Sequence, residues 1–429
     1  MRLLLSAIAL SAALFSGCQK NVAPGGPGVS AALKNVSAVG LNFRYEADVP
    51  QPAEPAKPAQ TEAGNPAIQA DFEQNRRDEL LDGTITSPDS KRILAVYHRP
   101  GDQPSEFRLD MYTADGKVLR RVTPDSMAVH FRETIRWAPD ASAVAFVATT
   151  RAKSDETQQQ IPAAPAVDPS ELDPIANVGT NAAPNQDANM AVPAETPLPA
   201  PETVLTFQSE QIYLCGADGD NLRALTQNEG LIYFYYVWSQ DSTMLAALAA
   251  TSREWGIMFQ RAELAGEVFT PIGRPRLIER NGRERRLDDG LTKVQPVWSP
   301  DSSKVAAAFD TQVRIYDAGG NPPTQAAIPL RNQLLLSSQA YERQQAEKLN
   351  APVDSNAQPP ANSNSAQQPT TLPDPNTLVS FNPIVTLNWA SDDLLYLETA
   401  AVKRMKIETD SAINFARWHR LVLSAQPGK

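Results

Sequence analysis

The chain has 429 residues, a net charge of −10 and a pI near 5.0. This acidic balance argues against binding of nucleic acid, whose phosphates require a basic surface. The only local exception, Arg274 to Arg286, is interrupted by Glu279 and Glu284, so we interpret it as a solvated loop or strand face.

The first residues are typical of an exported protein. Arg2 precedes an uncharged, mostly apolar run from Leu3 to Phe15. A transmembrane helix needs roughly 20 apolar residues, so this run is too short to span a bilayer and has the length of a secretory signal. The run is followed by Ser16, Gly17 and Cys18.

The Ser16-Gly17-Cys18 ending resembles the lipobox of bacterial lipoproteins, although Phe15 stands where the pattern more often has Leu. The resemblance implies that residues 1–17 are a signal peptide and that Cys18 carries a lipid anchor. It also implies localisation to the cell envelope. Because Gln19 and not Asp follows the cysteine, it favours the outer membrane, facing the periplasm, if the source has two membranes.

Long proline-rich tracts divide the rest of the chain, which contains 36 prolines. We expect residues 18–79 to be a lipid-anchored segment with a disordered Pro/Ala-rich linker (Val49 to Ala70), in which part of 37–47 pairs as a strand. Tracts near 152–203 and 350–378 are expected to be disordered insertions, because they cannot bury enough apolar surface to offset chain entropy. The folded domain should therefore cover 80–429.

A repeat defines the fold of that domain. Five segments share a pattern with an aspartate at one place, and four of them have a tryptophan three residues earlier; Thr86 takes that place in the first segment. The aspartates are Asp89, Asp140, Asp241, Asp301 and Asp392, and the tryptophans are Trp137, Trp238, Trp298 and Trp389.

We interpret these residues as structural. Each tryptophan ends a strand and buries a large ring. A Ser/Ala-Pro-Asp-Ser sequence, from which Gln240, Ser391 and Asp393 depart, then forms a tight turn. Proline presets φ there, and the Asp and Ser side chains bond nearby backbone N–H groups. A strand with alternating apolar residues comes next, and Asp-Gly pairs at Asp115-Gly116 and Asp218-Gly219 predict hairpins.

Several short strands per repeat of roughly 50 residues predict an all-β fold, a β-propeller of four-stranded blades. The repeats resemble those of TolB-type (WD-like repeat) propellers, whose consensus includes WSPDG, but the separate N-terminal α/β domain of TolB itself is not evident. The spacing of the repeat aspartates is consistent with five blades, and with six if one blade is degenerate. The fifth unit must borrow the C-terminal strands and an N-terminal strand, Val39 to Tyr45.

Two segments stand apart from the repeat. The segment from Gln333 to Leu349 has a helical pattern; we favour a helix packed on the propeller rim over an exposed partner site. Cys215 has no second cysteine to pair with if Cys18 carries lipid, and we expect it to be a small filler at a strand end.

No catalytic or metal-binding motif is present, and we expect no cofactor. The histidines His98, His130 and His419 lie in different repeat units, and Asp218 and Asp220 lack the rest of a calcium loop. The hypothesis favoured by the sequence is a non-catalytic scaffold that binds a protein of the cell envelope. The alternatives are an envelope hydrolase or lyase with a site in the propeller channel, and a propeller accessory to a membrane sensor or transport complex.

Overall fold

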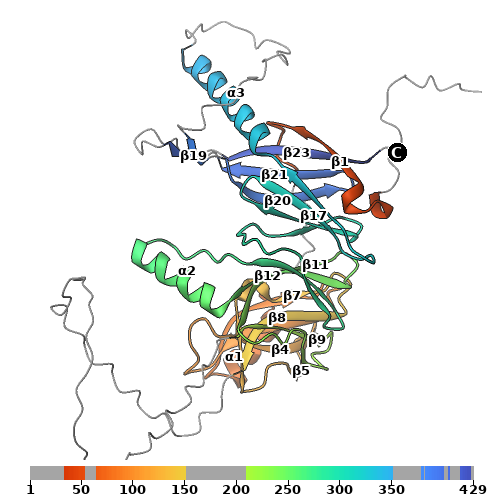
Figure 1. Cartoon of the computed structure of the whole chain (residues 1–429). Helices are drawn as coiled ribbons and strands as arrows, with labels where there is room; N and C mark the ends of the chain where they lie inside the picture. Colours follow the sequence, from red (N-terminus) through yellow and green to blue (C-terminus); the bar gives the residue numbers. More distant parts are fainter. Residues whose placement is uncertain are drawn as a thin grey trace, which may run out of the picture.

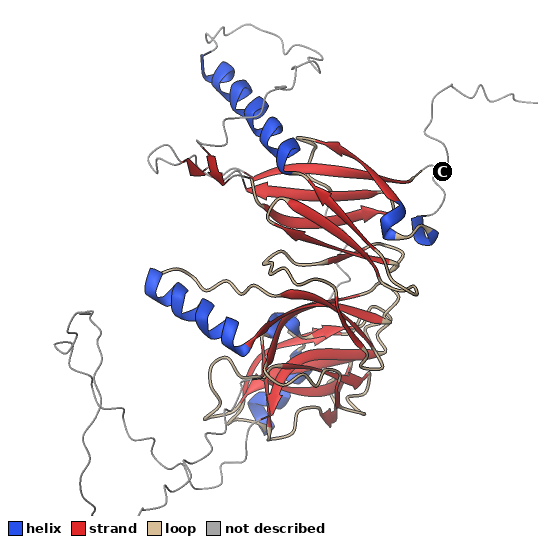
Figure 2. Ribbon diagram, viewed as in Figure 1, coloured by secondary structure: helices blue, strands red, loops and turns tan. Residues whose placement is uncertain are grey.

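A computed structural model describes residues 33–53, 64–150, 209–350, 378–380, 382–400, 404–405 and 416–426. Strands dominate these residues (Figure 2). They form five antiparallel sheets, each with four strand positions, which are the blades of a β-propeller. The signal sequence, Cys18 and most of the two predicted insertions lie outside the described residues.

The first four blades are consecutive in the chain. The first contains β2 (Leu80–Thr86), β3 (Arg92–His98), β4 (Arg108–Thr113) and β5 (Val118–Arg121). The second contains β6 (Met127–His130), β7 (Arg136–Trp137), β8 (Ala143–Thr150), β9 (Gln211–Gly216) and β10 (Arg223–Ala224). A 3-10 turn, η3 (Arg132–Thr134), separates β6 from β7, and both pair with β8.

The third blade contains β11 (Leu231–Trp238), β12 (Met244–Thr251), β13 (Arg274–Glu279) and β14 (Glu284–Arg286), with helix α2 (Ser252–Ala265) between its second and third strands. The fourth contains β15 (Val297–Trp298), β16 (Lys304–Phe309), β17 (Gln312–Asp317) and β18 (Gln325–Pro329). A separate pair of short strands joins β19 (Leu378–Ser380) to β22 (Arg404–Met405).

The fifth blade is assembled from both ends of the described chain. Its strands β20 (Ile384–Ser391), β21 (Leu394–Ala400) and β23 (Ala416–Ala425) are completed by β1 (Leu41–Glu46). β1 runs antiparallel to β23, with Leu41 opposite Ala425. The N-terminal strand that the repeat arithmetic required therefore lies at the edge of this blade, preceded by the short turns η1 (Leu33–Asn35) and η2 (Ala38–Gly40).

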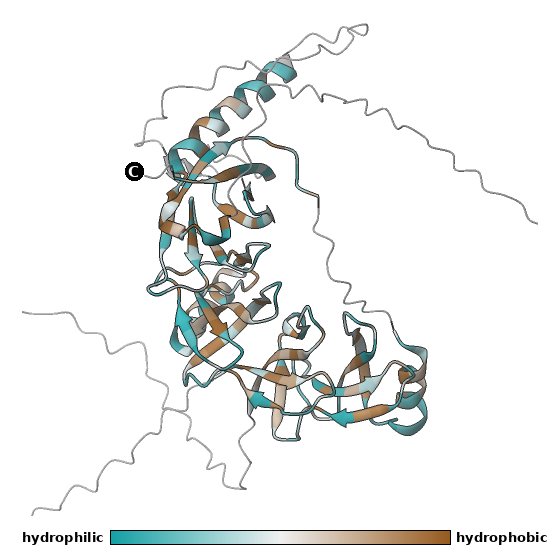
Figure 3. Ribbon diagram, turned by 90° about the vertical axis from the view of Figure 1, so that its right-hand side faces the viewer, coloured by the Kyte–Doolittle hydropathy of each residue, from teal (hydrophilic) through white to brown (hydrophobic). Residues whose placement is uncertain are grey.

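The blades follow one another along an arc, with the first and fifth at its two ends (Figures 1 and 3). Apolar side chains from the facing sides of neighbouring blades form the core. Between the fourth and fifth blades, for example, Ile315 and Val313 pack with Leu395 and Leu421. Because a blade between two others is covered on both faces, inner strands such as β8 and β12 are apolar and buried along most of their length.

Helix α1 (Pro66–Asn75) covers the free side of the first blade. Its Ile68 and Phe72 are buried against Tyr97 and Tyr112. The sequence-based expectation of a disordered linker through Ala70 was wrong for these residues. Asn65 caps the helix and Pro66 occupies its first turn, where a missing N–H costs nothing, so the proline initiates the helix and does not break it.

Helix α3 (Arg331–Asn350) coincides with the helix expected over 333–349. Its first turns pack against the fourth and fifth blades, since Leu334, Ser337 and Ser338 are buried. Among the described helices, none combines the length and the apolar character needed to cross a membrane.

Candidate functional site

The repeat tryptophans join neighbouring blades. In three blades the indole Nε1–H donates to a backbone carbonyl of the preceding blade, at the residue just before that blade's own tryptophan position. The bonds are Trp137 to Ile85 (3.3 Å), Trp238 to Arg136 (3.4 Å) and Trp298 to Val237 (3.1 Å).

The repeat aspartates lie in the turns that follow. In the first four units the carboxylate accepts a hydrogen bond from a nearby hydroxyl: Ser87 to Asp89 (2.7 Å), Ser142 to Asp140 (2.6 Å), Ser239 to Asp241 (2.7 Å) and Ser299 to Asp301 (2.6 Å). The bond from Ser87 holds the pKa of Asp89 below its ordinary value. These carboxylates are therefore engaged in holding turns.

The same turns also contact each other across blades. The backbone N–H of Asp140 donates to the hydroxyl of Ser242 (3.0 Å), and that of Asp241 donates to Ser302 (3.1 Å). Both serines adopt a left-handed conformation with φ of 60°. The Trp–Asp unit thus fixes the position of one blade on the next, which the turn chemistry alone did not predict.

The fifth unit departs from the expected alignment. The hydroxyl of Ser391 donates to Asp393 (2.8 Å) and not to Asp392, the residue that the repeat alignment selected. A register irregularity between Trp389 and Ser391 causes this shift. Trp389 is buried, but its indole N–H has no hydrogen-bond partner among the residues that the structure describes.

Two of the three histidines lie against carboxylates. His98 Nδ1 is 2.9 Å from a carboxylate oxygen of Asp82, on the neighbouring strand of the first blade. His130 Nδ1 is 2.7 Å from Glu210, whose side chain is buried. Each histidine is distant in sequence from its carboxylate partner, so the sequence alone did not reveal these contacts.

His419 lies in the fifth blade and is fully buried. Its ring nitrogens contact the hydroxyls of Tyr45 (2.9 Å) and Thr399 (3.0 Å). Burial, reinforced by the nearby charge of Arg417, lowers the pKa of His419 to about 4. The imidazole is therefore neutral at pH 7 and joins β1 to the body of the blade.

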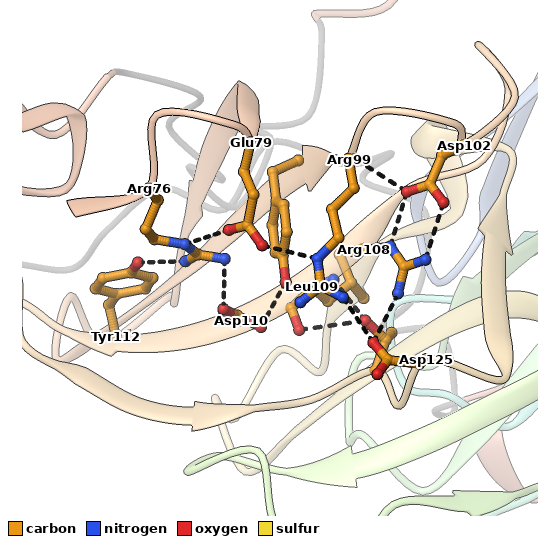
Figure 4. Close-up of polar contacts among 11 residues, drawn as sticks. Arg76, Glu79, Arg99, Asp102, Arg108, Leu109, Asp110, Tyr112 and Asp125 are labelled. Atoms are coloured by element: carbon orange, nitrogen blue, oxygen red, sulfur yellow. Dashed lines mark hydrogen bonds and ion pairs between the residues drawn. The ribbon is translucent and has the colours of Figure 1, made fainter. Parts of the chain in front are cut away.

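The densest group of charged side chains lies on the side of the first blade that α1 covers (Figure 4). Arg76, at the end of α1, bonds to Glu79 and to the hydroxyl of Tyr112 (2.8 Å), and lies 2.9 Å from Asp110. Arg99 continues the chain of contacts by bonding to Glu79 (2.7 Å).

The network extends further along the same blade (Figure 4). Arg99 donates to Asp125 (2.7 Å), and Arg108 donates two bonds to Asp102, of 2.7 and 2.9 Å. Arg108 and Asp102 are both nearly inaccessible, with side chains 6% and 5% exposed. Such bidentate pairs are preorganised and rigid.

Burial dominates the electrostatics of this group. It raises the pKa of Asp110 above its usual range, although Arg76 and Arg121 lower it in part. It also raises the pKa of Tyr97 to about 12, and the Tyr97 hydroxyl donates to Asp110 (3.2 Å). For Glu79 the outcome is reversed: burial opposes ionisation, but bonds from Arg99 and Arg76 bring the pKa below its ordinary value.

An open recess of about 550 Å³ lies beside this network. Its walls come from the end of α1, the loop that follows and the last strands of the first blade. The lining residues include Asp71, Arg76, Arg77, Asp78, Asp110, Val118 and Arg121. This concave surface therefore carries charges of both signs, next to the apolar side chain of Val118 on β5.

Two sequence-based interpretations of possible reactive groups can be compared with the structure. Cys215 is buried, and burial raises its pKa to about 12, so the thiol is a filler as expected. Within the described ranges, no three His, Cys, Asp or Glu side chains are grouped so that they could hold a metal ion.

The sequence did not reveal the first-blade network. Its members come from the end of α1, from strands β3 and β4 and from the loops around them, and no spacing rule connects them. The available signal was the density of arginine and acidic residues from Asp71 to Glu79, directly after the proline-rich segment Val49 to Ala70 that was expected to be a linker.

Comparisons with solved structures found distant likenesses. An oligogalacturonate lyase in complex with manganese has 12% identity and a TM-score of 0.26, with 56% of this chain and 45% of that chain covered. A putative TolB from Agrobacterium tumefaciens has 13% identity and a TM-score of 0.25, covering 56% and 62%. Prolyl oligopeptidase B from Galerina marginata has 9% identity and a TM-score of 0.36, covering 90% and 43%.

This chain thus spans less than two thirds of each of these proteins, and likenesses so distant carry no information on function. No family model matches the sequence, and no curated protein matches it.

Proposed function

We propose that this chain is a lipid-anchored protein of the cell envelope whose propeller binds another protein and catalyses no reaction. The observation that carries the proposal is the surface of the first blade. Among the described strands β5 ends its sheet, so one of its edges is paired with no other described strand. Val118 and Leu119 on this strand are 52% and 40% exposed.

This edge lies beside the recess lined by Arg77, Asp78 and Arg121. An exposed strand edge can pair with an extended segment of a partner, and exposed apolar residues bordered by polar ones are typical of protein interfaces. The ion pairs of Arg76 and Arg108 hold the underlying surface in one shape, so little ordering would be required on binding.

The experiment compares crosslinked membranes from cells that express the parent chain or Val118→Glu. A protein that co-purifies with the parent should be reduced at least tenfold with Val118→Glu. Leu291→Glu is the control, because Leu291 is also exposed (37%) but lies far along the chain from β5. Equal recovery with all three proteins would exclude the β5 edge as the binding surface.

The anchor is tested separately. Cys18→Ala should move the protein from the membrane fraction to the soluble fraction, because a thioether-linked lipid requires the thiol, and each buried CH₂ adds about 0.8 kcal/mol of membrane affinity. Cys215→Ala, at the buried thiol, should remain with the membranes. A Cys18→Ala protein that still partitions entirely with membranes would show that the anchor is elsewhere.

The second candidate function, an envelope hydrolase or lyase, is favoured by one recess of about 350 Å³ where residues of the third, fourth and fifth blades meet. Tyr235 and Lys293 both line it. Burial raises the pKa of Tyr235 to about 12, so its phenol would act as a proton donor and not as a base at neutral pH. The parent would be assayed with esterase, peptidase, glycosidase and polysaccharide-lyase substrates. Turnover that is lost in Lys293→Met would support this candidate against the scaffold.

A further inference from the structure

Helix α2 exposes several of its apolar side chains to solvent. None of its 14 residues is buried. In the described part of the chain, four of the nine exposed large apolar residues lie in this helix or just after it. They are Ile257 (40% exposed), Phe259 (50%), Leu264 (89%) and Val268 (91%).

The helix is nevertheless firmly built. Thr251 and Glu254 form a capping box at its start, and Gly266 ends it with φ of 63°. Arg274 donates two bonds to Glu254, of 2.8 and 2.7 Å, which ties the helix to β13. Trp255 packs against Phe234, with ring centroids 5.6 Å apart. The exposed residues are thus part of a stable element and not of a frayed end.

The outward face of α2 combines apolar and basic groups. Arg253, Ile257 and Arg261 follow at intervals of four residues, and Leu264 follows Ile257 by seven, so these four side chains lie along one side of the helix. Neither arginine forms an ion pair within the part of the chain that the structure describes. A complementary occupant must offer apolar and acidic side chains.

One segment of this chain ends beside the start of α2. The insertion that follows β8 rejoins the fold at Ser209, whose hydroxyl accepts a bond from the N–H of Gly230 (2.7 Å). The carbonyl of Gly230 in turn accepts a bond from the N–H of Ser252, the first residue of α2 (2.9 Å). The end of the insertion is therefore connected to the first residue of α2 through two hydrogen bonds, both to Gly230.

The chemistry of that segment matches the face. Residues 198–207 read LPAPETVLTF, and they contain no basic residue but include Glu202, Leu205 and Phe207. Ten extended residues reach about 33 Å, and a helix of 14 residues is about 21 Å long, so the segment can follow the whole of α2.

We propose that residues 198–207 occupy the outward face of α2, with Phe207 near Ile257, Leu205 toward Leu264 and Glu202 within reach of Arg261. Attachment at Ser209 gives the segment an effective concentration of order millimolar, far above that of a free partner. This inference concerns contacts within the chain and does not depend on the proposed function.

Other occupants fit the face less well. Residues 252–268 contain three acids (Glu254, Glu263 and Glu267) and two bases (Arg253 and Arg261), so anionic lipid would not attract them. A second copy would present the same four side chains, which include no acid to pair with the arginines.

The test uses the full chain with Cys18→Ser, which leaves only the buried Cys215 as a natural thiol. Leu205→Cys is combined with Leu264→Cys, or, as a control, with Leu80→Cys, since Leu80 is 61% exposed on the first blade. Disulfide formation in oxidised glutathione is followed by peptide mass spectrometry. The intrachain disulfide should form at least tenfold faster in the Leu264 pair.

A second readout uses the dye ANS, which reports accessible apolar surface. Leu205→Ser with Phe207→Ser should increase ANS fluorescence at least twofold, whereas Val192→Ser, earlier in the same insertion, should not. Equal disulfide rates in both cysteine pairs would overturn the proposal. A predominance of interchain disulfides between Leu264→Cys residues would overturn it in favour of a second copy. Binding of the parent to phosphatidylglycerol vesicles that Leu264→Glu abolishes would overturn it in favour of a bilayer.

Discussion

The junctions among the first four blades differ from the junction between the fourth and fifth. Trp137, Trp238 and Trp298 each donate an indole hydrogen bond to the preceding blade. Trp389 is also buried, at 8% exposure, but its N–H donates to no group in the described part of the chain. The difference arises from one residue in the turn.

In the first four blades, the residue at the tryptophan position pairs with the residue seven places later, as Trp298 does with Val305. In the fifth, Trp389 pairs with Leu395, six places later. The shorter connection moves the turn aspartate to Asp393 and alters the strand next to Trp389. A repeat can therefore keep its sequence signature while losing the hydrogen bond that the signature normally provides.

The fifth blade depends instead on distant parts of the chain. β1 supplies its last strand, and Arg417 on β23 donates two bonds to Asp48, of 2.7 and 2.8 Å, just beyond β1. The same buried region contains His419 and Tyr45. Repeat bonds between neighbours connect the first four blades, whereas polar contacts between the two ends of the described chain stabilise the fifth.

The largest effect is expected from Trp298→Ala, which removes both the buried ring and its bond to Val237. A loss of about 3–5 kcal/mol in the free energy of unfolding is expected for such a truncation. Chemical denaturation measures it. An unchanged midpoint would contradict the assignment of Trp298 to a blade junction.

A smaller effect is expected from pH. The free energy of unfolding should depend on pH because of His419 in the fifth blade. The pKa of His419 is about 4 in the folded protein and about 6.5 when unfolded. Because the folded pKa is lowered, the stabilisation is present above pH 6.5 and is lost as the pH falls toward 4. The loss should reach at most about 3 kcal/mol.

Denaturation curves between pH 7 and pH 4 measure this loss. His419→Gln should flatten the dependence, whereas His98→Gln, at a side chain 28% exposed, should leave it largely intact. The same slope in all three proteins would mean that other groups cause the acid sensitivity.

Replacing tryptophan by phenylalanine isolates the indole bond. Trp298→Phe removes a hydrogen bond, worth about 1 kcal/mol, in addition to some packing. Trp389→Phe removes similar packing but no bond. The difference in unfolding free energy between the two variants should therefore be about 1 kcal/mol. Equal losses would show that the bond to Val237 contributes nothing.

The sequence predicted the architecture well because its main signal was periodic. Trp137, Trp238 and Trp298 recur with a turn aspartate, and this pattern implied blades, strand order and the borrowed strand at Val39 to Tyr45. Helix α1 was missed because Pro66 is equally typical of a linker and of a helix start. The network around Arg76 and Asp110 was missed because its contacts are set by the tertiary structure and connect residues 34 positions apart.

The smallest expected effect is a gain in stability from Ala141→Ser. The residue after the turn aspartate adopts φ near 60° in the first four blades, at Ser90, Ala141, Ser242 and Ser302. In the third and fourth blades its hydroxyl accepts a bond from the N–H of the preceding blade's aspartate, as Ser302 does from Asp241 (3.1 Å).

Ala141 has no hydroxyl, so the corresponding bond from Asp89 is not formed at the first junction. Ala141→Ser supplies the missing acceptor on a backbone that already has the same conformation, and a gain of about 0.5–1 kcal/mol is expected. Ser302→Ala is the matched reverse change and should lose a similar amount. Because Ala141 is only 8% exposed, a hydroxyl without a partner there would be destabilising. A lower unfolding free energy for Ala141→Ser would therefore show that the first junction is not built like the second and third.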